Sequence, residues 1–137
     1  MYKKIIRKVR VQTIHLKTSS LHDLTPANLS VIVAPHPDDE VFGCCGLMLR
    51  LIAQGKRVEL IIMTGGGKSH AGCCDIDENE LIRQRRQLTI RAAKEYGLSQ
   101  EYIHFLDYPD GGVLESDSQT DKLSSLLQKL VDEQDDV

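Results

Sequence analysis

The sequence predicts an α/β domain with a parallel sheet and flanking helices. Three short apolar runs, rich in β-branched residues, are each followed by a segment with helical periodicity. Strands that alternate with helices in this order favour parallel pairing and right-handed crossovers. With 137 residues, of which 41% are hydrophobic and 27% charged, the chain is long enough to form one domain with its own core.

The first strand–helix unit begins with SVIVA at residues 30–34, an apolar run typical of a buried parallel strand. A helix is expected to follow over residues 38–54, and Gly55 is expected to end it, because glycine favours the position just after a helix. Apolar residues recur in this helix at the spacing of a single helical face: Val41, Cys45, Met48 and Ile52.

The same order recurs twice. RVELIIM (57–63) is the second predicted strand, and a glycine-rich loop over 64–79 leads to a helix over 79–96. YIHFL (102–106) is the third predicted strand, and a last helix opens near residue 118. The residues expected to face inward from these two helices are Leu81, Leu88, Ala92 and Tyr96, then Leu123, Leu126, Leu127 and Leu130.

The N-terminal stretch, residues 1–29, is predicted to be a strand near 5–16 followed by a linker, and residues 30–137 to be the domain proper. The net charge of −3 gives no general reason to expect nucleic acid as a partner. No apolar run is long enough for a signal peptide or a transmembrane helix, so a cytoplasmic protein is expected. A homo-oligomer is left open.

The four cysteines form two adjacent pairs, Cys44–Cys45 and Cys73–Cys74, and neither pair has the CxxC spacing of a zinc site. Reduced thiols are therefore the favoured interpretation in a cytosolic chain. A metal or redox role for these thiols remains a weaker hypothesis.

A histidine and three acids follow the first predicted strand directly, in the segment HPDDE at residues 36–40. Functional loops of open α/β sheets lie at this carboxyl end of the strands. If a helix starts at Pro37, His36 and Asp39 project to nearly the same side and form half of a zinc site. Asp38 would then be placed to take a proton from a zinc-bound water. The alternative is a surface turn, for which proline and aspartate are equally suited.

Two further residues are candidates for binding a substrate. Arg83 lies near the start of the helix over 79–96, from where it could reach a pocket over the sheet edge, although most arginines of this helix are expected to face solvent. Asp110 lies in the segment YPDGG, where its default role is that of a turn former.

These segments together resemble the signature of the PIG-L/LmbE-like zinc-dependent de-N-acetylases. The similarity covers residues 30–114 and follows the family's order of motifs. Its four parts are APHPDDEVFGCCG (34–46), TGG (64–66), LIRQRRQLTIRAAKEYGL (81–98) and HFLDYPDGG (104–112).

The resemblance implies a Rossmann-like fold and removal of an acetyl group from N-acetylglucosamine-type amino sugars. It implies that His36 and Asp39 bind Zn²⁺ and that Asp38 is the general base. Arg83 and Asp110 match positions that hold sugar hydroxyls in the family. The expected partner is therefore a small amino-sugar conjugate.

One departure from the family concerns the third zinc ligand, a histidine in a later HPDH-like segment that this sequence lacks. The chain is therefore expected to be the N-terminal part of such a domain, with His70 or His104 as less favoured substitutes for that ligand. The alternatives to a deacetylase are a non-catalytic carbohydrate-binding or interaction module, or an inactive truncated fragment.

Overall fold

The computed structural model describes residues 28–70, 72–73, 75–112 and 117–135. The strand predicted near residues 5–16 lies outside these ranges. The described elements are β1 (Leu29–Ala34), α2 (Asp39–Ala53), β2 (Arg57–Thr64), the 3₁₀ turn η1 (Gly67–His70), α3 (Glu78–Glu95), the 3₁₀ turn η2 (Gln100–Tyr102), β3 (Ile103–Tyr108) and α4 (Asp117–Asp135).

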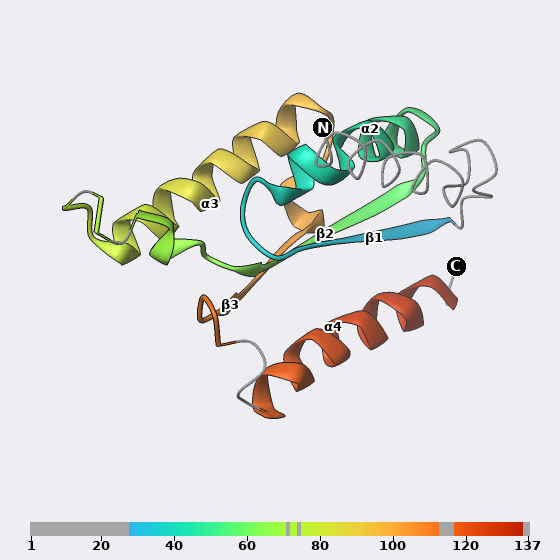
Figure 1. Cartoon of the computed structure of the whole chain (residues 1–137). Helices are drawn as coiled ribbons and strands as arrows, with labels where there is room; N and C mark the ends of the chain where they lie inside the picture. Colours follow the sequence, from blue (N-terminus) through green and yellow to red (C-terminus); the bar gives the residue numbers. More distant parts are fainter. Residues whose placement is uncertain (1–27, 71, 74, 113–116, 136–137) are drawn as a thin grey trace, which may run out of the picture.

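The three strands form a parallel sheet in the order β1-β2-β3, with β2 in the middle. Figure 1 shows α2 and α3 on one side of this sheet and α4 on the other. The predicted parallel α/β architecture is confirmed, and the predicted strands and helices agree with the observed ones to within two residues.

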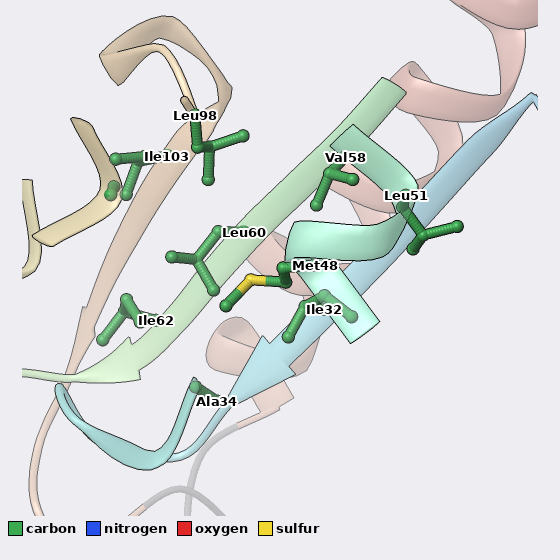
Figure 2. Packing of buried hydrophobic residues seen from close by; sticks show 10 residues of the cluster. Ile32, Ala34, Met48, Leu51, Val58, Leu60, Ile62, Leu98 and Ile103 are labelled. Atoms are coloured by element: carbon green, nitrogen blue, oxygen red, sulfur yellow. The ribbon is translucent and has the colours of Figure 1, made fainter. Parts of the chain in front are cut away.

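The main core lies between the sheet and α2. Val58, Leu60 and Ile62 alternate along β2 and face this core, as the period of two in a strand requires. In Figure 2 the side chain of Met48 from α2 points towards Leu60 and Ile32 of the sheet. The buried cluster consists of Ile32, Ala34, Met48, Leu51, Val58, Leu60, Ile62, Ala93, Leu98 and Ile103.

The buried side of α3 differs from the prediction. Leu81 is buried as expected, but Leu88 is 57% exposed, so its predicted inward position was wrong. The buried positions in the second half of the helix are Thr89 and Ala93, each one residue further along the chain. The apolar pattern overlooked Thr89 because threonine is a polar residue type, although its side chain is buried here.

The opposite face of the sheet carries a buried charge network. Glu59, 1% exposed, accepts a hydrogen bond from Arg57 Nε and pairs with His104 Nε2, each at 2.7 Å. Arg57 also donates to Glu133 of α4 at 2.9 Å. The Arg57 guanidinium and the His104 imidazole thus both contact the buried carboxylate, one at each oxygen, and such contacts compensate its burial. Together with the buried Leu130, this network fixes α4 against the sheet.

Candidate active site

The HPDD turn lies where predicted, at the carboxyl end of β1. The helix α2, expected over residues 38–54, begins at Asp39, and Asp38 is its N-cap. Asp38 adopts the left-handed conformation, with φ 107° and ψ −27°, which non-glycine residues adopt at a cost of about 1 kcal/mol or more. The backbone therefore turns sharply between the strand and the helix, and exposes the polar side chains of the turn at the sheet edge.

His36 and Asp39 come together in this turn. His36 Nδ1 lies 3.3 Å from Asp39 Oδ2, which also accepts the backbone N–H of His36 at 3.1 Å. Two donors held about 2.1 Å from a tetrahedral zinc ion lie roughly 3.4 Å apart. The observed separation and the imidazole and carboxylate donor types therefore fit two positions of a zinc site. Both side chains are about half exposed, at 49% and 45%, so an ion can reach them.

Arg85 is the arginine that the structure brings to this turn. Its Nη2 donates to the Pro37 carbonyl at 2.6 Å and to Asp38 Oδ2 at 2.9 Å. Its Nη1 donates to the Gly66 carbonyl at 3.0 Å and to Ser69 Oγ at 2.9 Å. A single guanidinium thus joins the end of β1 to the glycine-rich loop after β2, and orients the carboxylate of Asp38.

The sequence did contain a signal for Arg85. It is four residues after Leu81 and four before Thr89, on the buried stripe of α3. Arg83 is two residues away, roughly 200° around the helix, and therefore points in another direction. Its guanidinium binds Glu80 at 2.6 and 2.8 Å, and this hydrogen bonding lowers the pKa of Glu80 to about 2.

Asp110, in the segment after β3, binds the glycine-rich loop that Arg85 also contacts. Its carboxylate accepts the N–H groups of Gly66 at 3.2 Å and Lys68 at 3.0 Å, and Lys68 Nζ donates to its carbonyl at 3.1 Å. Burial raises the pKa of Asp110, but hydrogen bonds to the carboxylate and the nearby His36 outweigh burial and bring the pKa below its ordinary value. Asp110 therefore stays ionised and close to His36, at the edge of the candidate site.

A small cavity of about 170 Å³ opens beside Asp38. Pro37, Asp38 and Arg85 form its polar end, and Leu88 and Ala92 of α3 form an apolar side. The exposure of Leu88, unexpected from the sequence, places this residue at the cavity rather than in the core.

Below the turn, the side chain of Glu40 is 2% exposed and accepts the backbone N–H of Asp38 at 2.8 Å. Burial raises the pKa of this carboxyl above its ordinary value. The phenol of Tyr96 has a pKa raised to about 12, first by burial and then by the neighbouring Glu40 and Cys45. Sequence reasoning assigned Glu40 no part in the site.

No third metal donor joins His36 and Asp39 among the residues that the structure describes. His104 pairs with Glu59, and His70 contacts Cys73, with 3.5 Å between Nδ1 and Sγ. Neither histidine therefore takes the place of the third zinc ligand within the described chain. Cys44 packs against the main core, as a small apolar side chain does.

The fold and the turn together define an α/β protein with a polar site at the carboxyl end of its sheet. The sequence profile of the family described as "PIG-L: GlcNAc-PI de-N-acetylase" matches residues 31–137. The chain therefore belongs to this family. A comparison with curated protein sequences gives no match.

The chain is similar to several solved structures, among them the following three. N,N'-diacetylchitobiose deacetylase from Pyrococcus horikoshii, solved with an inhibitor, superposes with a TM-score of 0.69 and 25% identity over 94% of this chain and 46% of its own. The conserved protein TT1542 from Thermus thermophilus has a TM-score of 0.58 and 30% identity over 77% of this chain and 43% of its own. The hydratase GalB from Pseudomonas putida has a TM-score of 0.57 and 21% identity over 67% of this chain and 38% of its own, a similarity of fold alone.

The chain thus spans less than half the length of these proteins. In the part of the chain that the structure describes, no helix has the length and apolar character needed to cross a membrane.

Proposed function

We propose that the chain is the part of a zinc-dependent hydrolase that removes the acetyl group from an N-acetylglucosamine-type amino sugar. The observation that carries this proposal is the spacing of His36 Nδ1 and Asp39 Oδ2, 3.3 Å, with the Asp38 carboxylate beside them in the same turn. Membership of the de-N-acetylase family supports the reaction, and the similarity to a chitobiose deacetylase supports the sugar class.

His36 and Asp39 would hold Zn²⁺ through an imidazole nitrogen and a carboxylate oxygen. When bound, the metal polarises the amide carbonyl and makes water a better nucleophile. Because a catalytic zinc site usually has three protein ligands, a further donor is expected from outside the described residues.

Asp38 would act as the general base. Its side chain is 56% exposed, so water and substrate can reach the carboxylate. It would accept a proton from the attacking water as the new C–O bond forms, and return that proton to the amine nitrogen as the C–N bond breaks. Arg85 holds one carboxylate oxygen at 2.9 Å and so fixes the direction of the carboxylate. The products are acetate and the free amino sugar.

Asp110 and Arg83 are the residues that we propose to contact the sugar. Asp110 is well placed beside His36, although its carboxylate already accepts two loop N–H groups. Arg83 contacts Glu80, so binding of the sugar by Arg83 would require this exposed pair to separate, whereas Arg85 already contacts the Asp38 carboxylate. A cytoplasmic location stays a prediction.

Release of acetate from N,N'-diacetylchitobiose in the presence of Zn²⁺ tests the proposal, with a panel of other N-acetylglucosaminides beside it. The proposed function predicts acetate release by the wild-type chain that is lost in Asp38→Ala. Asp38→Asn is the matched variant, since it keeps the shape of the side chain but cannot accept the proton.

A second candidate function is a sugar-binding or interaction module without catalysis, favoured by the presence of two rather than three metal donors among the described residues. It predicts sugar binding that persists in a chelator and no acetate from any substrate. The similarity to the GalB hydratase also shows that the fold alone does not determine the reaction.

A further inference from the structure

The conformation of Asp38 needs an explanation. A helix N-cap residue ordinarily has extended φ and ψ angles, and its side chain accepts an N–H of the first turn. Asp38 instead has φ 107° and its side chain makes no such cap bond. Left-handed backbone is unfavourable for aspartate, so other contacts must hold the residue in this conformation.

Glu40 supplies one of these contacts from inside the fold. Its Oε2 accepts the Asp38 N–H at 2.8 Å, and the Glu40 side chain is almost fully buried at 2% exposure. The bond spans only two residues, so it closes a tight ring around the peptide between Asp38 and Asp39. Arg85 contacts the same residue from outside, because it donates to the carboxylate of Asp38 and to the carbonyl of the preceding Pro37.

An ordinary acid in the first turn of a helix is exposed and interacts with the helix dipole. Glu40 differs, because burying a carboxylate is costly unless specific hydrogen bonds compensate it. Its neighbour in the same turn, Asp39, is 45% exposed and shows the ordinary pattern. The Glu40 carboxylate accepts backbone N–H groups of its own turn, its own and that of Asp38, and a buried acid used in this way indicates a role in holding the turn.

We propose that Glu40 is a positioning residue: by accepting the Asp38 N–H it holds Asp38 in the left-handed conformation that presents its carboxylate to Arg85 and to the cavity at the end of β1. The catalytic consequence rests on the function proposed above for Asp38, whereas the structural part does not. Without the bond, Asp38 relaxes towards an extended N-cap conformation, and its carboxylate leaves the position beside Arg85.

Amide hydrogen exchange, followed by NMR on the full chain, tests the structural part. In Glu40→Met, which keeps the length of the side chain but has no carboxylate, the Asp38 amide should exchange at least about tenfold faster relative to the Leu60 amide in the central strand. Glu40→Gln keeps an acceptor oxygen and should stay within about threefold of wild type. Glu59→Gln is the matched control, a buried acid whose replacement should leave the Asp38-to-Leu60 ratio unchanged.

An unchanged exchange ratio in Glu40→Met would overturn the proposal. Equal acceleration in Glu40→Gln and Glu40→Met would also overturn it, because charge rather than the hydrogen bond would then matter. In acetate release, Glu40→Met should lower kcat with little change in KM, and Glu40→Gln should restore kcat. If the wild-type chain releases no acetate, the function proposed for Asp38 fails, while the exchange ratios still decide the role of Glu40.

Discussion

Replacing Arg85 with methionine removes four hydrogen bonds that join α3 to the end of β1 and to the glycine-rich loop. The methionine keeps the apolar stem, so the change tests the guanidinium alone. We predict that this replacement lowers the free energy of unfolding by about 2 kcal/mol, for reasons that differ among the four contacts.

The Pro37 carbonyl loses a partly buried partner at 2.6 Å, which costs about 1 kcal/mol. The Gly66 carbonyl loses less, because Ser69 Oγ still donates to it at 2.8 Å. The ion pair with Asp38 contributes less than about 1 kcal/mol to the free energy of unfolding, because the Asp38 side chain is 56% exposed and solvent screens the pair. The bond to Ser69 lies at the surface and adds little.

Urea denaturation of Arg85→Met and of Arg83→Met measures the effect. Arg83 is the matched control, because its exposed pair with Glu80 on the same helix contributes little to stability. A free energy of unfolding for Arg85→Met within about 0.5 kcal/mol of wild type, or an equal loss of stability in the two variants, would show that the four hydrogen bonds of Arg85 do not stabilise the turn.

Three further changes test other parts of the structure. Met48→Ala should lower the free energy of unfolding by about 2–5 kcal/mol, because Met48 is fully buried, and a urea midpoint close to that of wild type would contradict this. Tyr96→Phe should leave stability at neutral pH equal or higher, since the buried Tyr96 hydroxyl has no hydrogen-bond partner among the described residues, and a large loss would contradict this. In an ultraviolet absorbance titration the Tyr96 phenol should ionise near pH 12. Because the pKa of Tyr96 is higher in the folded protein than in the unfolded chain, the free energy of unfolding should fall as the pH rises from about 10 towards 12. Asp110→Asn should lose less stability in acid than the wild-type chain does. The pKa of Asp110 is lowered in the folded protein, so ionised Asp110 stabilises the fold above about pH 4 and this stabilisation is lost below it. Denaturant midpoints that fall equally steeply in the variant and in the wild-type chain from about pH 6 down to about pH 3 would be inconsistent with this.

The sequence predicted the order of elements well because periodicity is a local property. SVIVA and RVELIIM are mostly apolar, which suits strands buried on both faces, and β2 is indeed buried throughout Val58–Ile62. The face of α3 was predicted less well, because the buried stripe uses Thr89 and Ala93 while the larger Leu88 is exposed.

The position of the HPDD turn after β1 was predicted correctly, and so was the approach of the His36 side chain to that of Asp39. The helix was expected over residues 38–54, or from Pro37 if His36 and Asp39 were to pair, and it begins at Asp39, since Asp38 takes a left-handed conformation that residue type alone does not indicate. Arg85 and Glu40 were missed for a similar reason. Both bind backbone groups, the Pro37 carbonyl and the Asp38 N–H. The helical spacing of Arg85 from Leu81 indicates only that it lies on the buried face of α3, whereas the backbone group that each side chain reaches follows from the three-dimensional path of the chain.

The central claim is that His36 and Asp39 bind a metal ion together. Titration of the purified chain with Zn²⁺ by calorimetry, beside His36→Ala and Asp39→Ala, tests it most directly. One zinc ion should bind to the wild-type chain, and either variant should lose that binding. Zinc binding that is unchanged in both variants, or absent in the wild-type chain, would contradict it.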